Sequence, residues 1–505
     1  MKILYYNWVD YLDDQKRGGG VSQYQRNLLT HLDQQGDVEC LFLSSGLAHD
    51  LRNRKPRWSR ATHGMAKDRH RRFEIVNSGC MSPSHHSFGH PAQVSDPATV
   101  ETFADFVASQ GPFDVIHFNN LEGIPAEVLE LRKSLPGTRF VLSLHNYYPF
   151  CPQVNFWHRE TAHCDDFNGG ANCIDCLPFK PDPRMVRLAN SASFTLQKGG
   201  IGPGTKLYDH GARPAMRAGI KAIRKLASAR RRAAAAEAAS APQPAARDAS
   251  QRAEAFRARR ARFVSLINEN CDAVLCVSDR VRQIAQAHGI TPGLLHTSYI
   301  GSDHAALFTR TAPKETLLRP DGTAKMAYLG YMRRDKGFYF LLNALEALDD
   351  DLAARLHLVF AAAGRDPEAL ATFDRLRARF ASLTWHDGYR HDEMDGILSD
   401  TDFGIVPVLW EDNLPQVAIE MHSRHIPLLT ADRGGAQELG RHAGMVFRSE
   451  DIESLHGRLA EILDGKIDLQ TYWAGAMTPV SLDAHIRELL GHYADAAHTS
   501  HSASG

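Results

Sequence analysis

The sequence has no uninterrupted apolar stretch of the ~18 residues that a membrane-spanning helix needs. Its N-terminus, Met1–Asp14, passes from a short apolar run directly into acidic residues, without the apolar core and cleavage site of a secretion signal. It also has little excess charge, because 58 basic residues nearly balance 59 acidic ones. A global basic field, the usual mark of nucleic-acid binding, is therefore lacking. These absences predict a cytoplasmic protein with no nucleic-acid partner, associated with a bilayer at most peripherally.

Length and composition favour ordinary globular domains. The chain has 505 residues, more than one hydrophobic core usually supports. Two domains of roughly 150 to 200 residues, with insertions, are therefore expected. With 43% hydrophobic, 23% charged and 9% aromatic residues, the composition excludes a wholly disordered, collagenous or membrane-embedded chain.

Near-continuous apolar runs alternate with helical patterns through the first half of the chain. Such runs are what a parallel sheet covered on both faces requires. Helical patterns at Val21–Leu32 and Leu121–Leu135 lie between them, which predicts a doubly wound, Rossmann-like domain. The expected strands are Lys2–Asn7, Val38–Ser44, Phe73–Asn77, Phe113–Asn119, Phe140–Asn146 and Asp272–Ser278.

The same alternation of apolar runs and helical patterns resumes after a break near residues 300–320, which predicts a second Rossmann-like domain. Two such domains in tandem place a ligand crevice between them, at the carboxyl ends of facing strands. The expected division is 1–310, 311–480, and a C-terminal helix with a disordered tail at 481–505. The expected strands are Lys325–Gly330, Leu356–Ala362, Leu383–Gly388, Phe403–Val408, Pro427–Thr430 and Met445–Arg448, and the expected helices are Phe338–Leu348, Pro367–Phe380, Glu393–Leu398, Pro415–His422 and Asp451–Leu463.

Two segments of the first domain, 46–96 and 195–262, interrupt the pattern and are expected to be insertions. The first is interpreted as polar loops between early strands. Within the second, residues 213–262 contain fourteen basic against three acidic residues, in an Ala-rich sequence that favours charged helices around a flexible joint. This basic stretch is either a solvated insertion or a surface for anionic phospholipid headgroups or a pyrophosphate-linked lipid acceptor.

Glycines and histidines follow several of the expected strands. Gly18, Gly19 and Gly20 precede a helix, and their amides favour a phosphate group. They do not form the GxGxxG pattern of a dinucleotide site, so the run is either a phosphate contact or a simple turn. His117 and His145 stand at strand ends, from which an imidazole can reach the crevice and hydrogen-bond a sugar hydroxyl.

Basic residues are concentrated between the first strand and the first helix expected in the second domain. The segment begins at Gly330 and contains Arg333, Arg334 and Lys336. Cations beside a helix N-terminus can neutralise a diphosphate without a bound metal. A solvated, charged loop is the alternative.

The segment Trp410–Glu420 is the most informative part of the sequence. It leaves an apolar strand and enters a helix, with Pro415 near the first helical position, where its missing N–H is tolerated. Asp412 in the loop and Glu420 in the helix can face one cleft. Because one carboxylate can accept two hydroxyl protons, such groups suit the vicinal diols of a ribose or a hexose. Gly434 and Gly435, after the next strand, are expected to surround the same nucleotide-linked sugar.

Four of the eight cysteines lie within 26 residues. In a reducing compartment such a cluster indicates metal or redox chemistry before disulfides. A tetrahedral structural zinc beside the loop that follows His145 is the prediction, with His158 and His163 as substitute ligands. The predicted ligands are Cys151, Cys164, Cys173 and Cys176.

Taken together, these residues resemble glycosyltransferase family 4, which has the GT-B architecture of two facing Rossmann-like domains. The resemblance covers nearly the whole chain apart from the two insertions. The family's donor motif is an acidic residue, seven residues and a glutamate. Asp412 and Glu420 have that spacing, with aspartate in place of the usual first glutamate, and Glu411 is interpreted as an exposed neighbour.

The resemblance implies roles for the candidate residues. Glu420 would bind the ribose hydroxyls, while Asp412 and the segment after it would hold the donor hexose and its phosphate. The family's phosphate-binding pattern matches Gly330, Lys336 and Gly337, but Tyr331 occupies the usual arginine position, so Arg333 or Arg334 must replace it. His145 would face the reaction centre. The implied catalytic residues are His145, Lys336 and Asp412, and the implied donor-binding residues are Gly18, Gly19, Gly20, Gly330, Arg333, Arg334, Asn413, Leu414, Pro415, Glu420, Gly434 and Gly435.

The function implied is retaining transfer of a sugar from a nucleotide-sugar donor to a saccharide or lipid-linked saccharide, in cell-surface polysaccharide biosynthesis. The family needs no divalent metal for catalysis. Because such mechanisms have no obvious enzymic nucleophile, the resemblance implies front-face attack by the acceptor hydroxyl, with the departing phosphate as the base and Lys336 with an arginine stabilising it. Two alternatives share the fold. One is a non-hydrolysing nucleotide-sugar epimerase, and the other is a non-catalytic sugar-binding protein.

Overall fold

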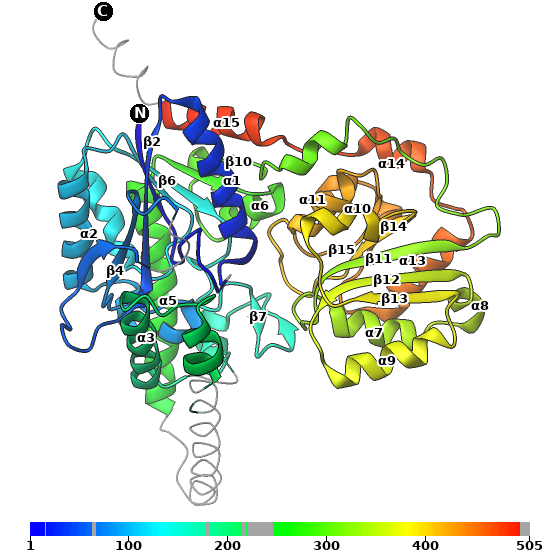
Figure 1. Ribbon diagram of the computed structural model, residues 1–505, viewed down its shortest axis with the longest axis horizontal. Helices are drawn as coiled ribbons and strands as arrows, with labels where there is room; N and C mark the ends of the chain where they lie inside the picture. The colour runs from blue at the N-terminus through cyan, green and yellow to red at the C-terminus, as the bar shows by residue number, and fades with distance from the viewer. Residues whose placement is uncertain (16, 63–66, 178–180, 215–218, 220–245, 495–505) are drawn as a thin grey trace, which may run out of the picture.

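Apolar strands form the centre of each half of the chain, as two parallel sheets with helices packed against them (Figure 1). The structure is a computed structural model that describes residues 1–15, 17–62, 67–177, 181–214, 219 and 246–494. It confirms the expected architecture of two Rossmann-like α/β domains in tandem.

Within the described residues, the first sheet has eight strands in the order β10-β9-β6-β5-β1-β2-β4-β3. Neighbouring strands run parallel, except that β3 is antiparallel to β4. The strands are β1 (Lys2–Tyr6), β2 (Glu39–Ala48), β3 (Arg57–Arg60), β4 (Arg72–Val76), β5 (Val115–Phe118), β6 (Arg139–Leu144), β9 (Ala273–Cys276) and β10 (Leu295–Thr297). The longer helices are α1 (Gly19–Gln35), α2 (Pro97–Gln110), α3 (Pro183–Lys198), α5 (Ala246–Asn270) and α6 (Asp279–Ala287).

The expected strand Phe73–Asn77 is present as β4. The rest of residues 46–96 is not inserted loop throughout, because it completes β2 and supplies β3, which pairs with β4. β4 begins one residue earlier than expected, at Arg72. The side chain of Arg72 is fully buried in β4, and its Nε donates to the two carboxylate oxygens of Asp10 at distances of 2.8 and 3.0 Å. Burial of a charge is tolerated when it is paired in this way, so a charged residue can occupy a strand inside the sheet.

The helix expected at residues 121–135 is instead a shorter 3₁₀ segment, Ala126–Ser134. Pro125 disfavours helical backbone at the residue before it, so the helical conformation begins only after this proline.

The second expected insertion, 195–262, also contains part of the domain itself. Its last residues belong to α5, a 25-residue helix whose Phe263 side chain is fully buried in the hydrophobic core of the first domain. The expected flexible joint falls mostly on residues 220–245, which lie outside the described part of the chain.

Two of the basic side chains in this segment serve the fold. The guanidinium of Arg259 is buried and donates to the carbonyl oxygen of Tyr148 at 2.9 Å. Arg260 donates through Nε to the carbonyl oxygen of Phe150 at 2.7 Å. These two side chains are therefore not available to the membrane-binding surface that was considered for residues 213–262.

The second sheet has six strands in the described residues, all parallel, in the order β13-β12-β11-β14-β15-β16. The strands are β11 (Ala324–Tyr331), β12 (Leu356–Ala363), β13 (Ser382–His386), β14 (Phe403–Val406), β15 (Leu428–Ala431) and β16 (Val446–Phe447). The helices are α7 (Phe338–Glu346), α8 (Asp350–Ala353), α9 (Pro367–Arg377), α10 (Met394–Ile397), α11 (Gln416–His422), α12 (Gln437–Gly440), α13 (Ile452–Leu463) and α14 (Leu469–Gly475).

The last helix, α15 (Leu482–Ala494), returns to the first domain and lies beside α1 (Figure 1). Its Ile486 and Leu489 are buried in one hydrophobic cluster with Tyr5 of β1. The first domain therefore includes the chain's last helix as well as its N-terminal half. The expected disordered tail falls mostly on residues 495–505, which lie outside the described residues.

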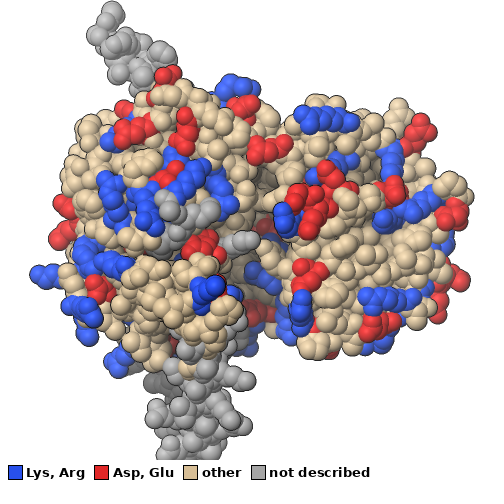
Figure 2. Space-filling view, in the orientation of Figure 1, with Lys and Arg blue, Asp and Glu red and all other residues tan. Residues whose placement is uncertain are grey.

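The surface matches the balanced composition. Figure 2 shows acidic and basic side chains interspersed over the face in view, in keeping with a formal net charge of -1. Among the described helices, none is both long and apolar enough to cross a bilayer.

Candidate active site between the domains

The loop after β14 brings two charged side chains together. Oδ2 of Asp412 lies 2.5 Å from Nζ of Lys336, which comes from the turn between β11 and α7. The same ammonium lies 5.3 Å from the centre of the Trp410 ring. A carboxylate and an aromatic face both stabilise the charged form of a lysine. The structure thus places two of the residues expected to act in catalysis, Lys336 and Asp412, in direct contact.

Glycines allow the close approach of the two turns that surround this pair. Gly337 has a φ of 71°, and a Cβ at this position would lie 1.6 Å from the carbonyl oxygen of Pro407. Gly434 also has a φ of 71°, and its Cβ would lie 2.1 Å from the carbonyl oxygen of Asp412. The amide of Gly435 donates to that same oxygen at 2.9 Å. Any larger residue at 337 or 434 would push the Asp412 loop away from the sheet.

The arginines that follow Gly330 are not arranged around Lys336. Arg333 donates to both carboxylate oxygens of Asp335, at 2.9 and 2.6 Å, and Arg334 is exposed. A diphosphate at this turn would have to compete with Asp335 for Arg333. The geometry therefore singles out neither arginine as the second phosphate ligand.

Glu420 lies on α11 and lines a cavity of about 270 Å³ between the two domains. Oη of Tyr389 donates to its Oε2 at 3.3 Å. Burial raises the pKa of Glu420 above its ordinary value, and the neighbouring His391 opposes that shift only in part. The lining of the cavity also includes Tyr24, Asn27, Ser302, His304, His391 and Gln416.

The segment from Asn413 to Gln416 contacts the first domain directly. Nδ2 of Asn413 donates to the carbonyl oxygen of Leu144, at the end of β6, at 3.1 Å. Nε2 of Gln416 donates to the carbonyl oxygen of Gly20 at 2.9 Å. Leu414, which follows Asn413 in the chain, is buried, and Pro415 immediately precedes α11. Gly19 and Gly20, expected to precede the first helix, instead form the first turn of α1, and this turn contacts the helix that carries Glu420.

Glu411 is not the exposed neighbour that the sequence suggested. Its side chain is only 2% exposed, because Arg280 at the start of α6 forms a two-pronged ion pair with it across the domain boundary. Nε and Nη2 of Arg280 lie 2.9 and 2.5 Å from the two carboxylate oxygens. The amide of Gly434 adds a third hydrogen bond at 2.9 Å. The sequence missed this residue because its partner is 131 positions away.

The electrostatics of Glu411 follow from these contacts. Burial alone would raise the pKa of this carboxyl, but the hydrogen bonds and charge of Arg280 outweigh it and hold the pKa below its ordinary value. At pH values above the ordinary glutamate pKa, the ion pair contributes its full stabilisation to the contact between the domains. This stabilisation is lost as the pH falls through the lowered pKa of Glu411.

A second carboxylate from the second domain caps a helix of the first. Glu438 of α12 accepts hydrogen bonds from the backbone amides of Asp279 and Arg280, at 2.9 and 2.7 Å, and from Oη of Tyr299 at 2.7 Å. A carboxylate at a helix N-terminus satisfies free amides and interacts favourably with the helix dipole. Two acidic side chains of the second domain thus converge on the start of α6.

His145 lies behind the cavity. Its Nε2 is 3.3 Å from Oδ1 of Asn119, and its ring centre is 5.2 Å from that of Tyr24, which lines the cavity itself. Burial, with a smaller effect of His485, lowers the pKa of His145 to about 3. The imidazole is therefore neutral at physiological pH and can exchange hydrogen bonds but carries no charge. Its expected catalytic role stays a prediction.

His117 does not face the crevice. It is fully buried in the first sheet, where Nδ1 lies 2.5 Å from Oη of Tyr493 and Nε2 lies 2.7 Å from Oγ of Ser143. Both ring nitrogens are satisfied by the fold, so this histidine is structural.

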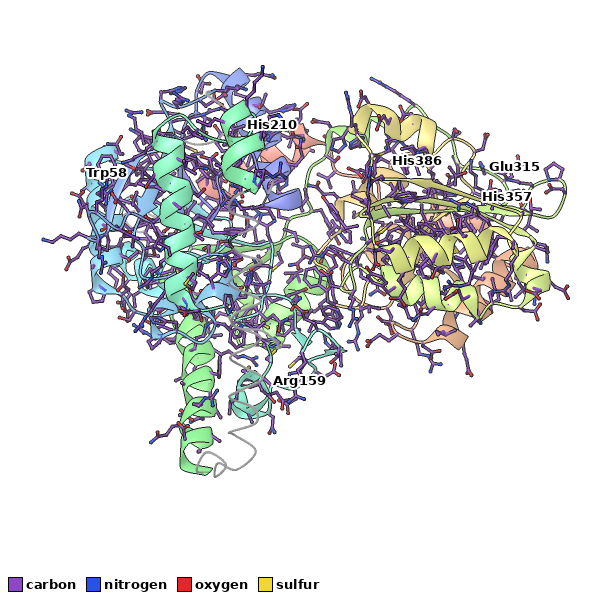
Figure 3. All side chains as sticks on the ribbon, turned by 60° about the horizontal axis from the view of Figure 1, so that its bottom comes forward. Trp58, Arg159, His210, Glu315, His357 and His386 are labelled. Atoms are coloured by element: carbon purple, nitrogen blue, oxygen red, sulfur yellow. The ribbon has the colours of Figure 1, made fainter. Side chains whose placement is uncertain are left out.

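The cysteine cluster lies in the irregular loop that follows β6 and projects toward the second domain, where Figure 3 labels Arg159 in its two-stranded hairpin. Burial raises the pKa of the thiols of Cys164, Cys173 and Cys176, and each thiol is also influenced by Cys151. Among the described residues, no three of the four sulfur atoms lie within 4.8 Å of one another. The zinc site therefore stays a prediction that would require these side chains to move together.

That prediction is tested by elemental analysis of the purified protein. The cysteines are expected to hold one equivalent of zinc per chain, which Cys173→Ser should remove and which Cys40→Ala, a substitution in β2 away from the loop, should keep. Protein that contains no metal would remove the zinc site.

The interdomain ion pair gives a second prediction. Glu411→Gln should loosen the contact between the domains, because the amide cannot carry the charge that holds the Arg280 guanidinium. Small-angle X-ray scattering should show a larger radius of gyration for this variant at neutral pH. The control is Glu453→Gln on the exposed side of α13. Equal radii for the wild type and both variants would show that the pair does not hold the domains together.

Comparison with known proteins agrees with this geometry. Residues 309–476 match the family described as Glycosyl transferases group 1. No curated protein sequence matches the chain. Among solved structures, sucrose-phosphate synthase from Thermosynechococcus elongatus aligns with a TM-score of 0.52 at 14% identity, over 98% of this chain and 99% of that one. Alr3699/HepE from Anabaena, in complex with UDP, aligns with a TM-score of 0.52 at 12% identity, over 97% and 99%.

A third structure, the lipopolysaccharide outer core galactosyltransferase WaaB, aligns with a TM-score of 0.51 at 11% identity, over 97% of this chain and 99% of that chain. At these identities the structural likeness establishes the fold, and the family match establishes the type of the second domain. Residues 309–476 of this chain therefore match the Glycosyl transferases group 1 family, within a fold of two Rossmann-like domains that these solved structures share.

Proposed function

We propose that this enzyme transfers a sugar, with retention of anomeric configuration, from a nucleotide donor to a saccharide or lipid-linked saccharide acceptor in cell-surface polysaccharide assembly. One observation carries the donor part of this proposal. A single loop and helix, residues 410–420, holds Asp412 against Lys336 and presents Glu420 to the cavity between the domains.

The spacing along this segment fits a nucleotide-linked sugar. Glu420 would accept hydrogen bonds from the ribose hydroxyls, for which a carboxylate has enough acceptor sites. Asp412 and the amides of Asn413, Leu414 and Gln416 would hold the hexose and its phosphate, with Gly434 and Gly435 beneath. The structure of HepE contains UDP, so uridine diphosphate sugars are the first donors to test.

The reaction that we propose needs few groups from the protein. The acceptor hydroxyl oxygen forms a bond to the anomeric carbon on the face from which the diphosphate leaves. The bond between that carbon and the phosphate oxygen breaks, and the hydroxyl proton passes to the departing diphosphate. Lys336 stabilises the charge that develops on the diphosphate, for which it must turn from Asp412 toward the leaving group. His145 would hydrogen-bond the sugar as a neutral imidazole.

The location of the enzyme is part of the same proposal. We place it in the cytoplasm, at the inner face of the membrane where lipid-linked acceptors are found. Because Arg259 and Arg260 contact the fold, the remaining basic residues of 213–262 are those proposed to contact anionic headgroups.

The proposal predicts that Glu420→Ala and Lys336→Ala each reduce transfer at least ~100-fold in folded protein, as losses of key polar contacts in other active sites do. The lysine variant should lower kcat, because it acts on the departing charge. The glutamate variant should raise the KM for the donor, because it acts on bound ribose. Transfer is measured by mass spectrometry with a panel of nucleotide sugars and a lipid-linked acceptor.

Glu453→Ala and Lys466→Ala are matched controls, since both side chains are exposed and lie outside the site. Full activity in both Glu420→Ala and Lys336→Ala would overturn the mechanism. Exchange at the sugar C2 without transfer would indicate an epimerase, and tight binding without turnover a sugar-binding protein.

A further inference from the structure

Three potential metal ligands converge beside the donor cavity. They are Nε2 of His304, in the segment that links the two domains, Nδ1 of His391, after β13, and Oε1 of Glu420 on α11. His391 Nδ1 and His304 Nε2 lie 3.7 and 4.0 Å from Glu420 Oε1. Among the described residues, this is the one group of histidine, cysteine or acidic side chains whose three donor atoms all lie within 4.8 Å of one another.

These separations suit a tetrahedral ion. Zinc binds histidine nitrogen and carboxylate oxygen at about 2.0 to 2.2 Å, which places two ligands of one ion roughly 3.4 Å apart. The two distances to Glu420 Oε1 exceed that value by about 0.3 and 0.6 Å, and the two histidine nitrogens lie within 4.8 Å of each other. Small side-chain rotations would therefore bring all three atoms onto one ion.

A further hydrogen bond holds one of the three ligands in place. The Tyr389 hydroxyl orients the carboxylate of Glu420 from its other oxygen, at 3.3 Å. Such an outer contact fixes a ligand in its binding position.

The site has room for further ligands. All three residues line the cavity of about 270 Å³, so water or another molecule can complete the coordination. Two imidazoles and one carboxylate select zinc, cobalt, nickel or copper over magnesium and calcium, which prefer oxygen ligands.

We propose that His304, His391 and Glu420 bind a divalent transition-metal ion in the nucleotide-free enzyme, and that this ion and the donor ribose exclude each other. The exclusion rests on the proposed function, because it assumes that Glu420 is the ribose ligand. With Oε1 bound to the ion and Oε2 accepting a hydrogen bond from Tyr389, the carboxylate would not be free to accept both ribose hydroxyls. Transition-metal ions would then act as inhibitors competitive with the donor, and donor binding would release the metal.

The experiment uses chelator-treated, full-length protein titrated with zinc in a calorimeter. His304→Ala and His391→Ala should each weaken zinc binding by at least about tenfold, the smallest loss usual even for an outer contact. His357→Ala should bind zinc as the wild type does. His357, labelled in Figure 3, lies at the N-terminal end of β12, whereas the cavity lies at the carboxyl ends of the strands. Circular dichroism checks that the variants are folded.

Cobalt distinguishes this site from the cysteine cluster. Bound to imidazole and carboxylate, cobalt(II) lacks the strong thiolate-to-metal charge-transfer absorption that cysteine ligands give. Unchanged metal affinity in both His304→Ala and His391→Ala would overturn the metal site. The proposed site would also be wrong if all of the bound cobalt showed thiolate absorption, because the metal would then be bound by cysteines.

Competition is tested with uridine, which has the ribose but lacks the phosphates that bind zinc in solution. Saturating uridine should weaken zinc binding to the wild type. If zinc binding depends on both histidines but is unaffected by bound uridine, mutual exclusion is wrong, and with it the placement of ribose on Glu420. The two failures are therefore distinguishable.

Discussion

The conformation of the candidate site depends on how two adjacent buried carboxylates are neutralised. Glu411 and Asp412 follow the same strand, and each would be costly to bury without a cation. Asp412 takes its cation from the second domain, as Lys336, whereas Glu411 takes Arg280 from the first. The loop that carries both residues is thus held by both domains, and Arg433 of the second domain also lies 3.5 Å from Glu411 Oε1. This constraint explains why the acidic pair lies at the cleft and not on an open surface.

Much of the fold could be predicted because apolar runs specify buried parallel strands regardless of partner. The strands of the second domain, such as Leu356–Ala363, appear where the apolar pattern places them. The pattern missed β3, whose sequence Arg57–Arg60 is charged, and the charged first residue of β4. Arg72 is buried in β4 because Asp10 pairs with it, and no local signal in the sequence reveals a partner 62 positions away.

In the candidate site too, features within one segment could be predicted, whereas contacts between distant residues could not. Spacing within one segment identified Asp412 and Glu420, because both lie on one loop and helix. Glu411 and Glu438 could not be assigned, since their partners at the start of α6 lie 131 and 158 positions away. The cysteines stand out in the sequence because they are clustered along the chain, whereas His304, His391 and Glu420 come from three separate elements. Only the fold brings the latter three together.

The central claim is that the first domain completes the donor site through Arg280 and Glu411. A double-mutant cycle on affinity for uridine diphosphate tests it, with Arg280→Met, Glu411→Gln and the double variant compared by calorimetry. The account predicts a coupling of ~1.5 kcal/mol or more, because either single change already breaks the pair that holds the donor loop. Single effects that add within ~0.5 kcal/mol would show that the two residues act independently, and would contradict it.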